Sequence, residues 1–323
     1  MPTPAFSYDP VTDNGLQLPP MLAVVGPTAS GKSELAVELA ERLGGEVINT
    51  DSLQLYRYLD IGTAKPEPAL RERVPHHLID LLEPDEHFSA GRFVSEARRV
   101  IGHLTKTGRV AVLCGGTGLY FKSLVFGLAD IPKVPPEVRA RVEELINHQG
   151  VVASHQELLR LDPDYGARLH ENDRARVQRA LEVVLATGKS LATFQGRQPF
   201  QEQAQGVCFV AYQWERAALY DRINQRAEAM LAAGLEEEVA RVLAMGFSPS
   251  IKPLQAIGYR EVVAVLQKSL ERGGLAEAIA QRTRNYAKRQ LTWLRKTPDV
   301  HWLPPGDITG ALTVAENFLN SKR

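Results

Sequence analysis

Apolar residues in the first part of the chain fall into short continuous runs, separated by longer segments with helical periodicity. The run Met21–Val25 is typical of a strand buried on both faces. The segment from Ser33 to about Leu43 is predicted to be a helix, which ends at two glycines. Such alternation predicts a parallel α/β sheet with right-handed crossovers. Further predicted elements are strands at Glu46–Asn49, at His77–Asp80 (a weak signal) and at Arg109–Cys114, with a helix over about Ala90–Thr107.

The pattern changes after a proline-rich segment at residues 131–136. From residue 137 to about 193 the apolar positions have only helical spacing, which indicates a helical insertion. A polar Gly/Gln stretch then leads to another strand-like run, Val207–Tyr212. We therefore predict a proline-rich flexible N-terminal arm over residues 1–20, an α/β core over residues 21–130 and 206–323, and an all-helical insertion domain over residues 131–205.

The last third of the chain is predicted to be mostly helical, which gives the core a helical C-terminal part. One more strand is predicted near the end, at Val300–Leu303. The predicted helices are about Glu215–Ala233, Leu235–Met245, Glu261–Ser269 and Leu275–Lys296.

Composition narrows the protein class without identifying a function. Hydrophobic residues make up 44% and charged residues 24% of the 323 residues, as in ordinary globular proteins. No apolar run approaches the roughly 18 residues of a membrane-spanning helix, and the N-terminal segment does not resemble a secretion signal, so we expect a cytoplasmic protein with no membrane partner. The formal net charge is zero, so any nucleic-acid binding requires local basic patches. The two cysteines, Cys114 and Cys208, lie far apart and favour neither a disulfide framework nor a structural zinc site.

A phosphate-binding loop is the sharpest local signal. Residues 26–33 read GPTASGKS, a full match to GxxxxGK[ST] between a predicted strand and a predicted helix. Backbone N–H groups of such a loop surround a phosphate, Lys32 reaches its oxygens and the Ser33 hydroxyl ligates Mg²⁺. We therefore expect a P-loop NTPase-like core. The predicted phosphate- or diphosphate-binding residues are Gly26, Pro27, Thr28, Ala29, Ser30, Gly31, Lys32 and Ser33.

The loop by itself indicates phosphate and not ATP. An ATPase or GTPase usually has a carboxylate at the end of a second strand for Mg²⁺ and water. Here the strand ending at Cys114 is followed by Gly-Gly-Thr, and no guanine-reading NKxD motif occurs. The bound group is therefore expected to be a diphosphate that leaves, without transfer of a γ-phosphoryl group.

Asp51 follows the second predicted strand and should lie at the carboxyl edge of the sheet, where open α/β folds bind ligands. It is a candidate general base or metal ligand next to the phosphate. The competing interpretation is that Asp51 caps a helix beginning at Ser52. Position alone does not separate the two.

Together with the P-loop, several ordered motifs resemble the bacterial tRNA dimethylallyltransferase family, also called tRNA isopentenyltransferase. The resemblance runs from about residue 21 to 303. Tyr58 departs from the pattern because a glycine is common there, and Ser33 replaces the commoner threonine but still supplies a hydroxyl. The motifs are NTDSLQLY (49–56), DIGTAKP (60–66), PHHL (75–78), GGTGLY (115–120), NDRARVQRALE (172–182), GYRE (258–261) and AKRQLTWLR (287–295).

This resemblance implies a reaction. A dimethylallyl group moves from dimethylallyl diphosphate to N6 of the adenosine that is 3′ to the anticodon, with Mg²⁺ assistance and loss of pyrophosphate. Asp51 would be the general base, and Lys32 would neutralise charge on the leaving group. Arg222 and Thr117 would assist. We expect the protein to be a monomer that binds the tRNA anticodon stem-loop, and by the resemblance the helical insertion would hold the stem-loop through Arg176 and Arg179.

A basic segment supports RNA binding. Residues 281–296 contain six basic side chains and no acidic one. Without the family resemblance, a solvated helix face would be the simpler interpretation of this segment, and Trp293 fits a core position better than a stacking platform. By the resemblance, the tRNA-contacting residues are Asp51, Ser52, Leu53, Gln54, Ala175, Arg176, Val177, Gln178, Arg179, Gln255, Ala256, Ile257, Gly258, Tyr259, Arg260, Lys288, Arg289, Gln290, Leu291, Thr292, Trp293, Leu294 and Arg295.

Two other functional classes compete with this assignment. A P-loop small-molecule or nucleoside kinase would share the loop, the sheet and a helical lid, to which Arg139 and Arg141 could contribute. A non-catalytic RNA-binding protein could carry an inactive P-loop. The missing second carboxylate and the basic segment disfavour the kinase, and the intact Lys32, Ser33 and Asp51 disfavour the non-catalytic protein.

Overall fold

The computed structural model describes residues 18–127, 131–194 and 206–322. Within them, residues up to Phe126 and residues from 206 onward form one compact unit, and residues 127–194 form a second. Seventeen residues of the predicted N-terminal arm lie outside the described residues. Of the remaining three, Leu18 packs against the main hydrophobic core.

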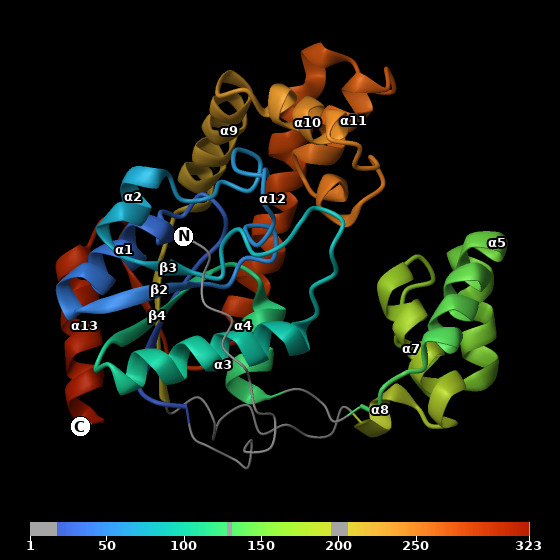
Figure 1. Ribbon diagram of the computed structural model, residues 1–323, viewed down its shortest axis with the longest axis horizontal. Coiled ribbons are helices and arrows are strands. Elements are labelled where there is room, and N and C mark those ends of the chain that lie inside the picture. Colours follow the sequence, from blue (N-terminus) through green and yellow to red (C-terminus); the bar gives the residue numbers. More distant parts are fainter. Residues whose placement is uncertain (1–17, 128–130, 195–205, 323) are drawn as a thin grey trace. The chain divides into compact units, whose positions relative to one another are not determined.

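A six-stranded parallel sheet forms the centre of the first unit (Figure 1). Its strand order is β3-β2-β4-β1-β5-β6, and every neighbouring pair is parallel, as the alternating pattern predicts. The weak third strand is shorter than expected, because Leu78 and Asp80 adopt positive φ angles of 60° and 54° and leave the extended conformation. The strands are β1 (Met21–Val25), β2 (Gly45–Asn49), β3 (His76–His77), β4 (Val110–Gly115), β5 (Val207–Tyr212) and β6 (Val300–Leu303).

Helices cover both faces of the sheet, which is why its central strands are apolar on both sides. Leu22 and Val24 of β1 point into a core with helices α1 and α13, whereas Ala23 and Val25 point into a core on the other face. Helices α2, α4 and α13 were not predicted from the sequence. The helices of this unit are α1 (Lys32–Leu43), α2 (Pro68–Arg73), α3 (Ala90–Lys106), α4 (Gly118–Phe126), α9 (Arg216–Ala232), α10 (Leu235–Ala244), α11 (Tyr259–Leu266), α12 (Leu275–Leu294) and α13 (Ile308–Ser321), with short 3-10 helices at Lys252–Gln255 and Arg272–Gly274.

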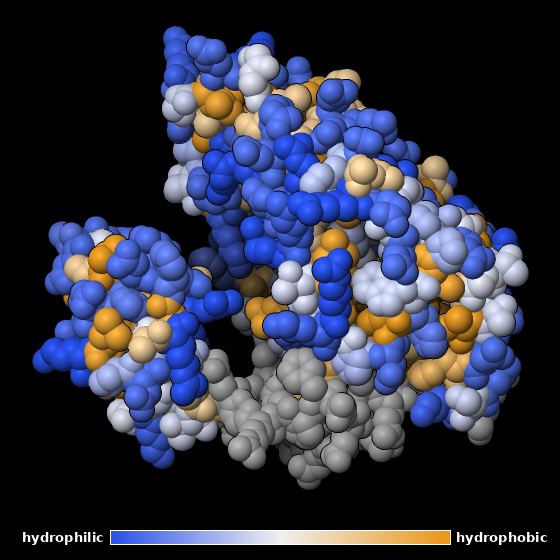
Figure 2. Space-filling view, turned by 180° about the vertical axis from the view of Figure 1, so that it is seen from behind, coloured by the Kyte–Doolittle hydropathy of each residue, from blue (hydrophilic) through white to orange (hydrophobic). Residues whose placement is uncertain are grey.

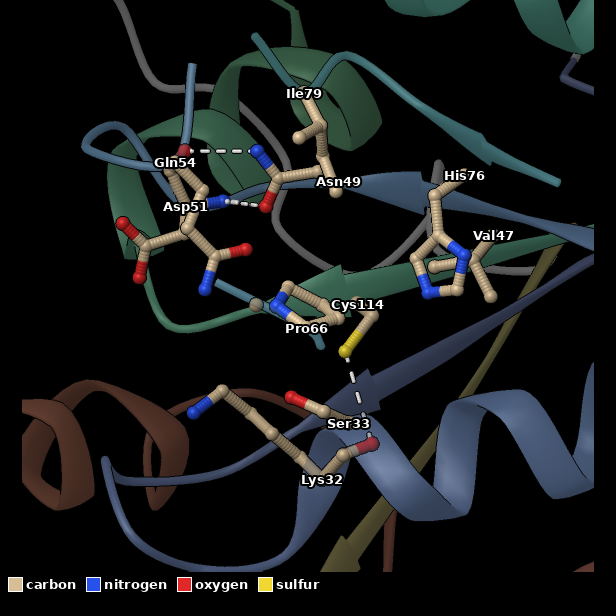
Figure 3. Close-up of a pocket in the computed structure, with 11 residues that line it drawn as sticks. Lys32, Ser33, Val47, Asn49, Asp51, Gln54, Pro66, His76, Ile79 and Cys114 are labelled. Carbon is tan, nitrogen blue, oxygen red and sulfur yellow. Dashed lines mark hydrogen bonds between the residues drawn. The ribbon is translucent and has the colours of Figure 1, made fainter. Parts of the chain in front are cut away.

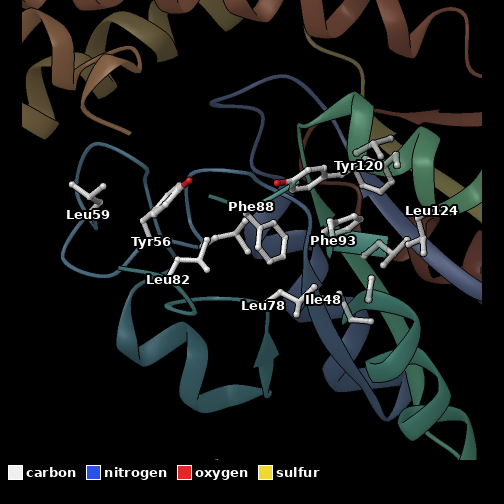
Figure 4. Close-up of a cluster of buried hydrophobic side chains, with 14 of the residues drawn as sticks. Ile48, Tyr56, Leu59, Leu78, Leu82, Phe88, Phe93, Tyr120 and Leu124 are labelled. Carbon is white, nitrogen blue, oxygen red and sulfur yellow. The ribbon is translucent and has the colours of Figure 1, made fainter. Parts of the chain in front are cut away.

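The core on the α3 side extends beneath the loop that follows β2 (Figure 4). Phe93 of α3 stacks on Tyr120 of α4 with ring centroids 4.1 Å apart and an 8° interplanar angle. Tyr56 and Leu59, from the loop after β2, are buried in the same core. Burial of these large side chains fixes the start of a segment that has no regular secondary structure.

The second unit is helical throughout its described residues, in agreement with the predicted insertion. Helix α5 contains a break at Gly150, where φ is 81° and ψ is 168°. Its core is formed by residues such as Val142, Leu158 and Leu181. The helices are α5 (Pro136–Leu161), α6 (Pro163–Gly166), α7 (Arg174–Thr187) and α8 (Leu191–Phe194).

Candidate active site

The strand register brings three functional segments to one edge of the sheet. Val25 of β1 is opposite Gly115 of β4, and Asn49 of β2 is opposite Cys114 of β4. The chain therefore leaves β1, β2 and β4 at the same carboxyl edge, which is where open α/β sheets bind ligands. The P-loop, Asp51 and Thr117 follow directly after these three strands.

The P-loop has the backbone that its glycines permit. Gly31 adopts φ 84° in the left-handed region and immediately precedes α1. A Cβ atom on Gly26 would come within 2.6 Å of the Ser30 hydroxyl oxygen, so this close approach requires glycine. The loop ends at the N-terminus of α1, where the helix dipole favours an anion.

Side chains from distant parts of the chain hold the loop in place. Gln290 of α12 accepts a hydrogen bond from the Thr28 N–H at 2.8 Å, and its amide nitrogen donates to the Gly116 carbonyl at 3.1 Å. The Trp214 indole donates to the Ser30 carbonyl at 3.0 Å, and Arg222 Nε donates to the Ala29 carbonyl at 2.8 Å. These bonds come from residues outside the loop, so they preorganise it before any ligand binds.

Lys32, Ser33 and Asp51 line a single pocket (Figure 3). Lys32 and Ser33 lie on one side of it, and Asp51 and Gln54 lie on the other. Burial lowers the pKa of Lys32 below its ordinary value, against the opposing influence of Asp51. The apolar part of the lining includes Val47. The further lining residues are Asn49, Pro66, His76, Ile79, Cys114 and Gly115.

Asp51 occupies a turn and not a helix start. Its Oδ1 accepts the Leu53 N–H at 2.9 Å, and its own N–H donates to Asn49 Oδ1 at 2.9 Å. The residues after Asp51 form turns, so the helix-cap interpretation is wrong. Asn49 is itself fixed, because its side-chain nitrogen donates to the Leu78 carbonyl at 2.8 Å. The carboxylate is therefore held in one orientation at the pocket.

Thr117 joins the loops after β2 and β4. Its Oγ1 accepts the N–H of Ser52 at 3.1 Å, and Ser52 is the residue that follows Asp51 in the sequence. Tyr286 of α12 is a neighbour that the sequence did not assign to the site. Burial, together with the negative charge of Asp51, raises the pKa of the Tyr286 phenol, and hydrogen bonds with Gln290 and Thr117 act in the opposite direction.

Two arginines of α9 reach this region with different surroundings. The Arg222 guanidinium lies 4.6 Å above the Trp214 ring as well as bonding to the P-loop. Arg226, one helical turn later, was not predicted as a site residue. Burial lowers its pKa, while the charges of Glu34 and Asp51 act to raise it. The i, i+4 spacing from Arg222 is the sequence signal that could have found it.

Comparison with known proteins agrees with this geometry. A family model described as IPP transferase matches residues 54–297, and one described as isopentenyl transferase matches residues 19–78. The chain belongs to the IPP transferase family. It is 47% identical over 299 residues to a tRNA dimethylallyltransferase of Geobacter sulfurreducens, covering 92% of this chain and 96% of the relative.

Solved structures of this family extend the agreement to the fold. The crystal structure of a tRNA isopentenylpyrophosphate transferase from Bacillus halodurans matches with a TM-score of 0.69 at 36% identity and covers 94% of this chain and 97% of that one. A eukaryotic dimethylallyltransferase, crystallised acting on tRNA, matches with a TM-score of 0.80 at 26% identity and covers 94% and 80%. The predicted resemblance and the predicted P-loop NTPase-like fold class are confirmed. The relatives are named for transfer of a dimethylallyl or isopentenyl group and not of a phosphoryl group, so the kinase alternative is not supported.

The basic segment of this family member is partly neutralised by acidic partners. Arg282 Nε lies 2.9 Å from Glu261 Oε1, and Arg284 lies 2.7 Å from Glu277. Within the described part of the chain no ion pair is formed by the remaining exposed cations of the segment. These are Lys288, Arg289, Arg295 and Lys296.

Several residues that the resemblance assigns to tRNA contact have buried side chains. Val177, Tyr259 and Leu294 are fully buried, and Gln290 is nearly so. Trp293 stacks on Phe121 with ring centroids 6.0 Å apart, in agreement with its expected core position. These side chains therefore pack within the protein or, in Gln290 and Tyr259, hydrogen-bond inside it, and their exposed neighbours are the ones available to contact RNA.

His76 and His77 both have partners within the protein. His76 Nδ1 lies 2.9 Å from the Val74 carbonyl, and His77 Nε2 lies 2.7 Å from Glu46 Oε2. Among the described residues, no group of three or more His, Cys, Asp or Glu side chains is arranged to hold a metal ion. Cys114 is buried in the α1-side core, as expected for a small apolar residue.

Proposed function

We propose that this protein transfers a dimethylallyl group from dimethylallyl diphosphate to N6 of the adenosine on the 3′ side of a tRNA anticodon. The observation that carries the proposal is one pocket lined by Lys32, Ser33 and Asp51. A diphosphate held by the P-loop would place its attached carbon next to the Asp51 carboxylate. Family membership supports tRNA as the substrate, since the relatives are named for tRNA.

Groups of the pocket can account for every bond, charge and proton of the transfer. The adenine N6 forms a bond to C1 of the dimethylallyl group as the C1–oxygen bond breaks, and pyrophosphate leaves with the electron pair. The new cationic amine loses one proton to Asp51. Lys32 and the P-loop N–H groups stabilise the negative charge that grows on the leaving group. Asp51 needs only an ordinary carboxylate basicity for this, because an alkylated adenine amine is strongly acidic until it loses its proton.

The oxygen donors of the pocket fit a Mg²⁺ ion that binds together with a diphosphate. Mg²⁺ is commonly held by one or two protein oxygens together with phosphate oxygens and water. Ser33 supplies the hydroxyl and lines the same pocket as Asp51. The ion, when bound, would neutralise diphosphate charge, and Ser33 would hold it against the P-loop.

Exposed basic side chains would bind the tRNA backbone. In the first unit these are Lys288, Arg289 and Arg295, and in the second they include Arg176, which is exposed on α7. Contacts of this kind fix the position of the RNA without reading its sequence. The target base lies in a loop and can be extruded for only a few kcal/mol.

One assay tests the proposal against its competitors. The protein is mixed with unmodified tRNA and labelled dimethylallyl diphosphate, and RNA is examined for label, with ATP supplied in a parallel reaction. We expect label in RNA that requires the adenosine beside the anticodon. Formation of ADP without RNA labelling would establish a kinase, and neither product with retained tRNA binding would indicate a non-catalytic protein.

A further inference from the structure

A buried glutamate of α10 holds the loop that follows the active-site aspartate. Glu238 is 1% exposed. Its Oε2 accepts the N–H groups of Asp60 and Ile61, both at 2.9 Å, and its Oε1 accepts the Gly62 N–H at 3.2 Å. Successive N–H groups that converge in this way form an anion-binding nest, which here is filled by a side chain of the protein itself.

Tyr259 completes this arrangement from α11. Its hydroxyl donates to Glu238 Oε1 at 2.7 Å, and its ring is fully buried. A Cβ atom on Gly62 would come within 2.4 Å of the Tyr259 ring, so the loop backbone rests directly on the aromatic face. Burial and the neighbouring Glu238 raise the pKa of the Tyr259 phenol, which therefore stays protonated and remains a donor.

The same loop orients Gln54 beside Asp51. The side-chain nitrogen of Gln54 donates to the carbonyls of Thr63 and Ala64 at 3.2 and 3.1 Å. Gln54 lines the pocket together with Asp51 (Figure 3). Its nitrogen is thus engaged by the loop, so the side-chain oxygen is the group of Gln54 that could accept a substrate N–H.

The loop depends on these bonds for its shape. Residues 57–65 contain turns and no helix or strand. The Thr63 and Ala64 carbonyls that bond to Gln54 are therefore not held in place by a helix or a sheet. Lys65 provides a second attachment, with Nζ 2.5 Å from Asp60 Oδ1 and 2.6 Å from Asp80 Oδ1. Removal of an acceptor that satisfies three backbone N–H groups would allow the loop to shift.

We propose that Glu238 is a positioning residue, which acts through the loop at residues 60–64 to set the Gln54 amide beside Asp51. The inference rests on the proposed transferase function. It also links the site to the segment 255–260, because Tyr259 lies within that segment and bonds to the same carboxylate. Glu238 itself would touch neither substrate.

The first measurement is the turnover of the full-length Glu238→Gln variant with saturating tRNA and labelled dimethylallyl diphosphate. Glutamine keeps the size of the side chain but presents an NH₂ group to N–H donors. We expect kcat to fall roughly 10- to 100-fold, as a small misplacement of a positioning group does. A kcat within twofold of the wild-type value would overturn the proposal.

A double-mutant cycle with Gln54→Ala separates positioning from a general loss of structure. If Glu238 acts through Gln54, adding Glu238→Gln to the Gln54→Ala variant should reduce kcat by less than about twofold further. Effects that multiply in the double variant would overturn the proposal. If Glu238→Gln fails to fold, Tyr259→Phe takes its place in the cycle with Gln54→Ala, because it removes only the hydroxyl that bonds to Glu238.

Asp162→Asn is the matched control. Asp162 is a nearly fully buried carboxylate that accepts the Tyr165 N–H at 3.3 Å within the helical second unit. Its effect on kcat should be the same in the wild-type and Gln54→Ala backgrounds. The wild-type reaction separates failure of the two proposals. If the wild-type protein does not label RNA, the proposed function is refuted. If it labels RNA normally but the effects of Glu238→Gln and Gln54→Ala multiply in the double variant, only the role of Glu238 is refuted.

Discussion

At the scale of single residues, the site combines a P-loop lysine, Lys32, with a carboxylate, Asp51, that hydrogen bonds hold in place. Lys32 is buried with Asp51 as a nearby opposite charge, and Asp51 is fixed by the Leu53 and Asn49 hydrogen bonds. Fixing the carboxylate before the substrate binds reduces the entropy lost in the reaction. Tyr58 adopts φ 67°, a left-handed conformation, which accounts for the glycine that is common at this position in the family but not for the tyrosine found here.

Replacement of Asp51 by asparagine should remove the proton acceptor and keep the shape of the turn. We expect kcat to fall by about 10²- to 10⁴-fold, the usual contribution of a general base. Binding of dimethylallyl diphosphate, measured by calorimetry, should remain. Asp85→Asn, in an exposed loop of the same unit, is the control and should leave kcat unchanged. Near-wild-type turnover of Asp51→Asn would remove this residue from the mechanism.

At the scale of elements, helix α12 serves the two substrates with different faces. Its inward face supplies Gln290 to the P-loop and Tyr286 to the surroundings of Asp51. Its outward face carries Lys288 and Arg289, which are exposed. Helical periodicity makes this division possible, because residues two positions apart point in different directions. Arg222 of α9 and Trp214, two residues before that helix, also bond to the P-loop.

Basic side chains of two helices should determine tRNA affinity. Lys288→Ala in α12 and Arg179→Ala in α7 should each raise the KM for tRNA and lower the slope of log affinity against log salt by about one. Arg99→Ala in α3 is the control matched to Arg179. Each arginine pairs with a glutamate of its own helix, Arg99 with Glu96 at 3.1 Å and Arg179 with Glu182 at 3.3 Å, but Arg99 lies outside the segments assigned to tRNA contact. Unchanged tRNA affinity and salt dependence in both test variants would contradict the assignment of these helices to RNA binding.

At the scale of the whole molecule, hydrophilic residues cover most of the visible surface of both units (Figure 2). No helix among the described residues is long and apolar enough to cross a membrane. The large hydrophobic side chains lie mainly in the two cores of the sheet and in the core of the helical unit. Both cysteines are among these buried residues.

Burial of the Cys114 thiol should make stability depend on pH in the alkaline range. Burial raises its pKa to about 12, whereas an exposed thiol ionises near 9. The unfolded chain then loses this proton first, so the free energy of unfolding should decline as pH rises from about 9 to 12. The corresponding maximum loss is of the order of 4 kcal/mol.

Urea unfolding of wild type and Cys114→Ala at a series of pH values tests this expectation. The variant should be less stable at pH 8 because of the lost packing, but its stability should decline less steeply above pH 9. Tyrosine ionisation is common to both proteins and cancels in the difference. Parallel pH dependences would show that the thiol is not protected by the fold.

Much of the fold could be predicted because its signals are local. The continuous apolar run of β1, the glycines of the P-loop and the stop of α1 each depend on a few neighbouring residues. Two elements are exceptions. Strand β3 is cut short by positive φ angles at Leu78 and Asp80, and α13 was not predicted although Asp307 caps its start. The P-loop and Asp51 were identified as site residues, but Arg226 and Tyr286 were not.

The sequence by itself determined the alternation of strands and helices, the phosphate loop and the family, because these follow from residue spacing along the chain. Only the tertiary structure decided which residues share the pocket, which basic side chains remain unpaired and which motif residues are buried. Gln290 lies 262 positions after Thr28 and bonds to it, and Glu238 lies about 177 positions after the loop it holds. Contacts across such separations depend on how the helices pack on the sheet, and no local pattern records them.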